Sequence, residues 1–204
     1  MEKRNEIRRK TVHLCLAIIP VLYFFFSRYV MLSLTGVLLF VAILVEGLRI
    51  FNSKFAVVFN QKLGNLLRAH EKRGLTGATY LFISSFFMIL LFQQNIAICV
   101  LFILIISDGL GALVGKLWGK HRLYGFKTVE GSIVFLVSAV LIVLFVFRRP
   151  LWIGWVGLIT AFCVEVLIQK IDDNFTIPLF AGGVMQILFM LTQQGVYQPY
   201  FTLH

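Results

Sequence analysis

The chain has 204 residues, of which 59% are hydrophobic and only 14% are charged. A soluble domain typically holds about 45–50% apolar and roughly 25% charged residues, so this composition excludes an ordinary soluble fold and a disordered chain. The net charge of +10 on so apolar a chain indicates a basic membrane protein rather than a nucleic-acid binder. The three cysteines (Cys15, Cys99 and Cys163) lie in apolar stretches without disulfide or metal spacing, so we interpret them as small hydrophobic residues.

Apolar runs along the chain predict an all-α polytopic membrane protein in which residues 1–204 form a single domain. A helix that spans a bilayer needs about 20 mostly apolar residues. About seven such runs follow one another, at residues 12–27, 29–48, 76–92, 95–115, 132–147, 151–169 and 177–193. The first run lacks the small-residue cleavage pattern of a signal peptide, and Pro20 is expected to kink its helix.

The basic residues predict the orientation of these spans. If the N-terminus is cytoplasmic, 16 of the 19 Lys and Arg residues lie on the inside, and only Arg28, Arg148 and Arg149 lie outside. The inside residues are Lys3, Arg4, Arg8, Arg9, Lys10, Arg49, Lys54, Lys62, Arg68, Lys72, Arg73, Lys116, Lys120, Arg122, Lys127 and Lys170. The excess of positive charge in cytoplasmic loops therefore predicts a cytoplasmic N-terminus and an outside C-terminus.

The longest connection, residues 52–74, is expected to form an amphipathic helix on the cytoplasmic surface. Its apolar residues recur at helical spacing, with basic residues between them. They are Phe55, Val58, Phe59, Leu63, Leu66 and Leu67, with Lys62 in the same pattern. Such a helix would contact anionic lipid headgroups, either as a surface anchor or as part of the route of a lipid substrate.

On this map all nine acidic residues fall on or near the cytoplasmic side. They are Glu2, Glu6, Glu46, Glu71, Asp108, Glu130, Glu165, Asp172 and Asp173. An ionisable group within a span is costly unless it is paired or hydrated, so each such acid is a functional candidate. The alternative is that acids such as Glu46 and Glu165 only pair with neighbouring Lys and Arg residues. That alternative is weaker for Asp108, whose own helix has no basic residue before Lys116.

The segment from Ser107 to Lys120 places small residues in a stripe behind Asp108. On a helix, Asp108, Gly111, Ala112, Gly115 and Gly119 share one face. Small residues let a second helix or a ligand approach the backbone closely, and helix packing is the commoner use. The carboxylate and the basic residues that follow suggest a phosphate group and a divalent metal ion. The spacing is one residue too short for a Walker A loop, and Leu117 replaces the metal-binding hydroxyl.

Two later segments add candidate ligands for a nucleotide. The loop from His121 to Ser132 contains Lys127 and Thr128 and leads into a helix that begins with Glu130-Gly131-Ser132. Free amides at a helix start bind anions, and Lys127 would add a positive charge. The sixth run ends in Asp172-Asp173-Asn174, whose side-chain oxygens are of the kind that Mg²⁺ prefers.

These motifs, taken in order, resemble the family of CTP-dependent lipid kinases, which comprises dolichol and polyprenol kinases, phytol kinases and CTP-using diacylglycerol kinases. No single motif is specific, but six in order cover most of the chain. The matching segments are Glu6 to His13, Glu46 to Arg49, Thr76 to Tyr80, Ser107 to Gly119, Lys127 to Ser132 and Asp173 to Pro178. The sequence departs from the family pattern in its additional glycines, Gly109 and Gly111, and in the second acid Asp172, which leaves open which acid binds metal.

The resemblance implies a kinase that transfers the γ-phosphate of CTP to the hydroxyl of a membrane lipid, with Mg²⁺, at the cytoplasmic face of a bacterial inner membrane or endoplasmic reticulum. By position, Arg9, Lys10, Asp108 and Gly115 match residues essential to the family, and Lys127, Glu130, Gly131, Asp173 and Asn174 match other signature positions. We hypothesise that Asp108 and Asp173, with Asn174, hold the metal. Arg9, Lys10 and Lys127 would neutralise the triphosphate, and the small residues of the glycine stripe would leave room for it.

The expected catalytic residues are thus Asp108, Arg9, Lys10 and Lys127, and the expected nucleotide-binding residues are Gly111, Gly115, Lys116, Thr128, Glu130, Gly131 and Ser132. Further candidates are His13, Glu46, Arg49, Glu165 and Asp172, with a carboxylate or His13 as a base.

Three other functions compete with this prediction. A CDP-diacylglycerol synthase also uses CTP in a membrane, but its C-terminal His-Gly-Gly-x-x-Asp-Arg signature is absent from this sequence. A transporter would place acids at the bilayer midplane in paired halves, whereas these acids crowd one side. A non-catalytic scaffold leaves the charge of Asp108 within a span unexplained. The identity of the lipid alcohol and the oligomeric state are not encoded in any motif.

Overall fold

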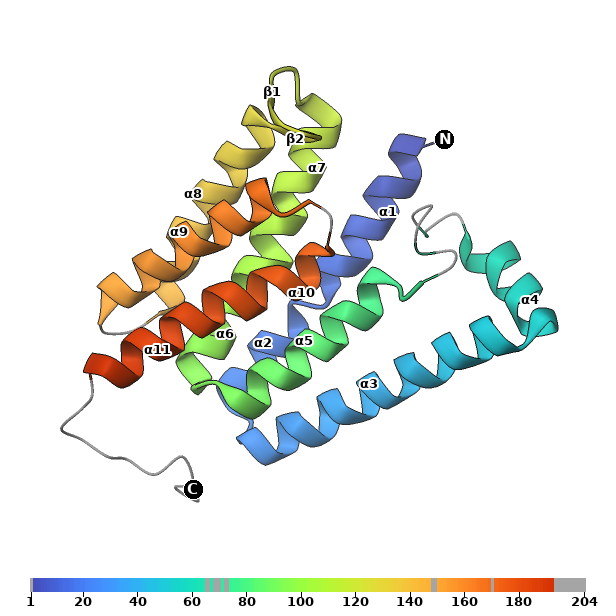
Figure 1. Cartoon of the computed structure of the whole chain (residues 1–204), viewed down its shortest axis with the longest axis horizontal. Helices are drawn as coiled ribbons and strands as arrows, with labels where there is room; N and C mark the ends of the chain where they lie inside the picture. The colour runs from blue at the N-terminus through green and yellow to red at the C-terminus, as the bar shows by residue number, and fades with distance from the viewer. Residues whose placement is uncertain are drawn as a thin grey trace.

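The computed structural model describes residues 2–64, 67, 71, 74–147, 150–169 and 171–192. In this part the chain is a helical bundle with one small β-hairpin (Figure 1). The first five helices are α1 (Glu2–Cys15), α2 (Ile18–Phe25), α3 (Arg28–Phe51), α4 (Ser53–Leu63) and α5 (Gly77–Leu91). The central helix joins α6 (Gln94–Phe102), the π-helical segment η2 (Ile103–Ser107) and α7 (Asp108–Trp118). The hairpin strands β1 (Arg122–Tyr124) and β2 (Lys127–Thr128) precede α8 (Val129–Val146) and α9 (Leu151–Leu167). The last helix joins α10 (Asp173–Ile177), the π-helical segment η3 (Pro178–Gly182) and α11 (Gly183–Thr192).

In the described residues, four helices are long and apolar enough to cross a membrane. They are α3, Gln94–Trp118, α8 and Asp173–Thr192, while Gly77–Leu91 and Leu151–Leu167 are apolar but shorter. The prediction of an all-α membrane protein is confirmed at this level, and the count of seven spans stays a prediction. Because α3 packs mainly on α5 at the edge of the bundle, Val37, Phe40 and Ile43 remain exposed, as expected for a lipid-facing helix.

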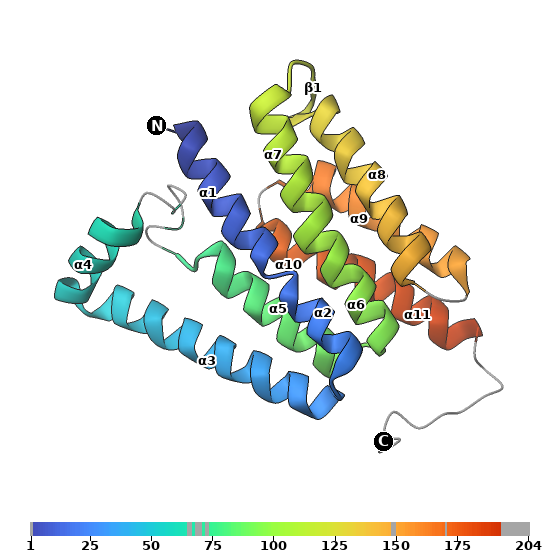
Figure 2. The ribbon, with the colours of Figure 1, turned by 180° about the vertical axis from the view of Figure 1, so that it is seen from behind.

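The first predicted span is divided between α1 and α2. The break falls at Leu16 and Ala17, one turn before Pro20. Proline has no N–H to donate, and its ring clashes with the carbonyl four residues back, which here is that of Leu16. That carbonyl instead accepts a hydrogen bond from Ile19 N at 2.9 Å. The expected kink is therefore a complete interruption, and it lets α1 lean against α7 (Figure 2).

The central helix Gln94–Trp118 is the most buried element. In its apolar stretch, 78% of the residues are buried, compared with 17% in α3. Within η2 the Asp108 N–H bonds to the Ile103 carbonyl, five residues back rather than four. Such π-helical turns occur frequently at functional sites, and this one lies directly before the carboxylate that the motifs single out.

The predicted amphipathic helix is present as α4, which ends at Leu63. The Asn52 side chain begins it by accepting a hydrogen bond from Phe55 N at 3.1 Å. Leu66 and the basic residues Arg68, Lys72, Arg73, Arg148, Arg149 and Lys170, which entered the predictions above, lie outside the described residues.

The loop expected at residues 121–128 is an antiparallel hairpin whose tip is fixed by Gln169. Gly125 has a φ of +54°, which favours glycine, and any Cβ there would collide with the Gln169 side chain. Gln169 Nε2 donates to Tyr124 O at 3.0 Å, and Gln169 Oε1 accepts from Phe126 N at 3.4 Å. Gln169, two residues after the end of α9, thereby holds the turn that directly precedes Lys127. We call this end of the bundle the hairpin end.

Candidate functional site

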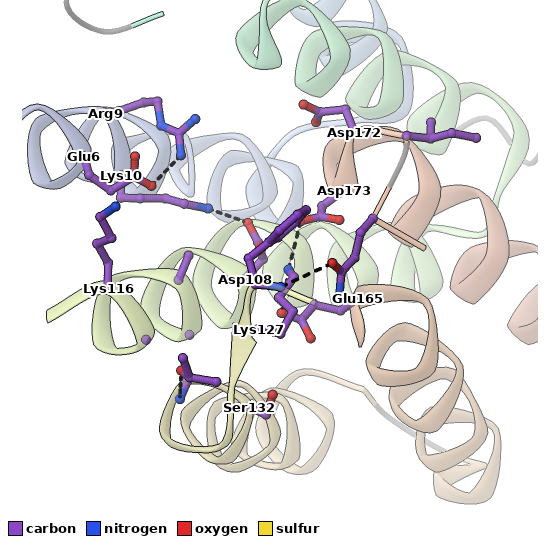
Figure 3. A pocket seen from close by; sticks show the side chains of 18 residues that line it. Glu6, Arg9, Lys10, Asp108, Lys116, Lys127, Ser132, Glu165, Asp172 and Asp173 are labelled. Carbon is purple, nitrogen blue, oxygen red and sulfur yellow. Dashed lines mark hydrogen bonds and ion pairs between the residues drawn. The ribbon is translucent and has the colours of Figure 1, made fainter. Parts of the chain in front are cut away.

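A polar cavity of about 660 Å³ lies at the hairpin end (Figure 3). Its walls come from α1, α7, β2, α8 and the segment that joins α9 to α10. This size is within the roughly 300–1,000 Å³ range of small-molecule sites. Residues far apart in the sequence, from Glu6 to Asp173, therefore meet around one space.

The pair of Lys10 and Asp108 joins α1 to the central helix. Lys10 Nζ lies 2.7 Å from Asp108 Oδ2, and the two residues are 4% and 3% exposed. Removing one partner of such a buried pair is strongly destabilising, because the remaining charge loses its nearest partner. His13, one turn further along α1, places Nε2 4.0 Å from the same carboxylate oxygen and 3.3 Å from Leu104 O in η2.

Lys127 forms a second charged cluster in the same cavity. Its Nζ lies 2.7 Å from Glu165 Oε1 and 3.1 Å from Asp173 Oδ2, so one ammonium group bridges α9 and α10. Burial alone lowers the pKa of Lys127, but the carboxylates of Asp173, Asp108 and Glu165 outweigh it and hold this pKa above its usual value. Lys127 therefore keeps its positive charge throughout the physiological pH range.

The charges that line the cavity nearly balance. Five acids (Glu6, Asp108, Glu165, Asp172 and Asp173) face four basic residues (Arg9, Lys10, Lys116 and Lys127). Such a site cannot neutralise a polyanion by itself, since Arg9, Lys10 and Lys127 already pair with acids. A triphosphate would require an additional cation.

The acids in the cavity fit a divalent cation that is held mainly by its substrate. Among the described residues, no three His, Cys, Asp or Glu side chains are grouped closely enough to form a metal cage. Mg²⁺ usually needs only one or two carboxylates, with phosphate oxygens and water completing its coordination. Glu165 Oε2 is buried without a hydrogen-bond partner in the described structure, which leaves one carboxylate oxygen available beside Lys127.

The glycine stripe serves the packing of α7 against α8. A Cβ on Gly131 would lie 2.6 Å from the Gly111 carbonyl oxygen and 3.2 Å from Gly115 Cα. A Cβ on Gly115 would lie 2.8 Å from Thr128 Oγ1, which caps α8 by accepting from Gly131 N at 3.2 Å. The same glycines also line the cavity. Their lack of side chains therefore allows α7 and α8 to pack closely and also leaves space in the cavity.

Most of the residues singled out in the sequence line this cavity. They are Arg9, Lys10, Asp108, Gly111, Gly115, Lys116, Lys127, Thr128, Gly131, Ser132, Glu165, Asp172 and Asp173. Five others lie elsewhere. Glu130 points away and accepts hydrogen bonds from His121, while His13 and Asn174 line a second, smaller cavity. Glu46 and Arg49 belong to a separate buried network.

That network attaches the end of α3 to the beginning of α5. Glu46 Oε1 accepts hydrogen bonds from Thr76 N at 2.8 Å and Thr79 Oγ1 at 3.0 Å. Arg49 donates from Nε to Glu46 Oε2 at 2.9 Å and from Nη1 to Glu71 O at 2.6 Å. These contacts match the alternative in which Glu46 pairs with a neighbouring basic residue.

Two residues that shape the cavity were not among the predicted site residues. Gln169 holds the hairpin, and Glu6 pairs with Arg9 at 2.5 Å across one turn of α1. The spacing of Glu6 and Arg9 on one helical face was available as a signal. Gln169 offered none, because its partners in the hairpin lie more than forty residues away in the chain.

Comparison with known proteins places the chain in a family. It is 30% identical over 187 residues to the uncharacterized protein RP860 of Rickettsia prowazekii, a match that covers 85% of this chain and 90% of that protein. The chain belongs to the family of RP860. No protein-family model and no solved structure matches the chain.

A more distant relative has a described activity. The chain is 24% identical over 152 residues to the CTP-dependent diacylglycerol kinase 1 of Schizosaccharomyces pombe, which covers 66% of this chain and 70% of the kinase. This similarity and the apolar helices fit a membrane lipid kinase at the level of the family.

Proposed function

We propose that the chain is a membrane kinase that transfers the γ-phosphate of CTP to the hydroxyl group of a membrane lipid. The convergence of Arg9, Lys10, Asp108, Lys127 and Asp173 on one polar cavity supports this proposal, because these are the residues that the kinase motifs single out. The similarity to a CTP-dependent diacylglycerol kinase supports the same class of reaction.

The proposed reaction forms a bond between the lipid hydroxyl oxygen and the γ-phosphorus. The bond from that phosphorus to the β–γ bridging oxygen breaks, CDP leaves with the bonding electron pair, and the hydroxyl proton passes to water or to a carboxylate. Phosphoryl transfer requires mainly positioning and positive charge around the transferring group. Lys10 and Lys127 would supply that charge, each fixed by a carboxylate within 2.7 Å of its ammonium group.

A divalent cation completes the charge balance of the proposed site. Asp108 and Asp173 would hold Mg²⁺, with phosphate oxygens of the nucleotide and water completing its coordination. Bound there, Mg²⁺ would neutralise phosphate oxygens as charge develops on the leaving group. Asn174, which was also expected to bind metal, has its side-chain nitrogen directed to Gly77 O and Asp172 Oδ1 instead.

The decisive experiment uses CTP labelled separately at the α- and γ-phosphates. Purified protein in mixed micelles with polyprenol, phytol and diacylglycerol is expected to transfer γ-label, and no α-label, into lipid. Incorporation of α-label with release of pyrophosphate would replace the kinase by a cytidylyltransferase. Absence of transfer from either position to every alcohol would reject both enzymes.

A further inference from the structure

A second cavity, of about 290 Å³, lies next to the polar cavity. Its walls come from α1, α4 and the beginning of α5, and they are mostly apolar, with Val12, Leu16, Phe59, Leu63 and Ala78 among them. Val12 and Leu63 are 57% and 43% exposed, so the cavity has an apolar rim on the outside of the bundle.

The two cavities share one wall, formed by Arg9 and Lys10. The Lys10 side chain lines both spaces, and its ammonium group reaches Asp108 Oδ2 at 2.7 Å on the polar side. His13 lines the apolar cavity and approaches the same carboxylate to 4.0 Å. A ligand group bound between the two cavities would therefore lie close to the Asp108 carboxylate.

Asn174 gives the apolar cavity one acceptor for a hydroxyl group. The residue is 8% exposed, and its Oδ1 atom has no hydrogen-bond partner in the described part of the chain. Its Nδ2 atom donates to Gly77 O at 3.2 Å and to Asp172 Oδ1 at 2.7 Å, which fixes the orientation of the amide. A buried acceptor without a partner is costly, so a donor on a bound ligand would satisfy it.

We propose that the apolar cavity binds the hydrocarbon segment next to the hydroxyl group of the acceptor lipid. The hydroxyl group stands at the wall of Arg9 and Lys10, where it faces the phosphate donor in the polar cavity. This inference rests on the proposed kinase function. The volume of this cavity is just below the range of ordinary small-molecule sites. It therefore suits one segment of a long hydrocarbon chain, with the remainder of the lipid in the bilayer.

Photolabelling tests the binding site without requiring turnover. The full-length protein in detergent is exposed to hexadecanol that carries a diazirine near its hydroxyl end, and labelled peptides are mapped. We expect competable labelling on α1 and at the start of α5. Val12→Phe and Ala78→Phe fill the cavity from opposite walls and should each reduce this labelling about 10-fold, because one misplaced methylene in an apolar pocket already costs that much.

Val57→Phe is the matched control. Val57 is 56% exposed on α4 and lines neither cavity, so the same substitution at equal exposure should leave the labelling unchanged. Labelling that persists in both filled variants, or that maps to the outer face of α3, would overturn the assignment. If one filled variant does not fold, the other decides.

Kinetics separate this inference from the proposed function. With γ-labelled CTP, the filled variants should raise the KM for the lipid alcohol about 10-fold and leave the KM for CTP unchanged. A raised KM for CTP alone would assign the cavity to the nucleotide instead. If the wild-type protein transfers no phosphate but keeps the cavity-specific labelling, the kinase proposal fails and the lipid site stands. If it transfers phosphate while both filled variants label normally, only the lipid site fails.

Discussion

At the scale of single residues, the carboxylate of Asp108 lines the polar cavity and pairs with Lys10, which lines both cavities. Asp108→Asn keeps the shape of the side chain but removes the charge that faces Lys10 at 2.7 Å. We expect turnover to fall by about 10²–10³-fold or more, as when one preorganised electrostatic group is removed from an active site. The variant should also unfold more easily, by up to about 3–5 kcal/mol, because Lys10 is left as a buried unpaired charge.

The double variant Lys10→Met, Asp108→Asn separates these two effects. Replacing both partners of a buried pair is often neutral for stability, so thermal unfolding in detergent should return toward that of the wild type. Phosphate transfer should remain lost. Full activity in the single Asp108→Asn variant would remove this carboxylate from the mechanism.

Glu46 provides the contrasting case of a buried acid with a structural role. Glu46→Gln weakens the hydrogen bonds to Thr76, Thr79 and Arg49, and each bond to a charged group contributes about 1.5–3 kcal/mol. We expect a lower unfolding temperature, together with an unchanged KM for CTP in the protein that remains folded. A large change in the KM for CTP at normal stability would show instead that Glu46 contributes to the nucleotide site.

At the scale of elements, the contact between α7 and α8 decides how the glycine stripe is interpreted. Gly131→Ala places a Cβ 2.6 Å from the Gly111 carbonyl oxygen, a backbone atom that cannot turn aside. The helices must separate, at a cost of about 1–3 kcal/mol for overpacking. The unfolding temperature should therefore fall, although alanine alone favours a helix over glycine.

Gly47→Ala on α3 is the control, because a Cβ at that position meets no atom within 4 Å. It should leave activity at the level of the wild type and raise stability by about 0.5–1 kcal/mol, because alanine favours the helix interior over glycine. A Gly131→Ala variant that is fully stable but no longer binds CTP would show instead that the glycine is needed for the ligand.

Local signals predicted the helices well, whereas the site depended on contacts that no local pattern contains. All seven apolar runs coincide with helical segments. The apolar composition of a run and the effect of Pro20 on its helix both depend only on residues that are close together in the sequence. The π-helical turn before Asp108 and the Gln169 contact to the hairpin depend on packing between distant segments. Lys10 and Asp108 lie 98 positions apart, so only the order of known motifs could suggest that they meet.

At the scale of the whole molecule, charge and apolar surface are distributed along one axis. The hairpin end holds both cavities and exposed basic residues such as Lys54, Lys62 and Lys120. Arg28 lies at the opposite end, where its guanidinium donates to Ile89 O at 2.8 Å and also bonds to Phe92 O. Between these ends, α3 and α8 expose apolar side chains over lengths that suit a bilayer.

This distribution predicts that both cavities open toward the cytoplasm, because basic loops are retained there during insertion. In a variant without native cysteines, Lys120→Cys and Asn95→Cys mark the two ends at exposed positions. In spheroplasts of a bacterial host, an impermeant maleimide should label Asn95→Cys directly and Lys120→Cys only after permeabilisation. The reverse pattern would place the polar cavity outside, away from the cytoplasmic nucleotide pool. In that case CTP could not be its natural ligand, and the kinase proposal would fail together with the predicted orientation.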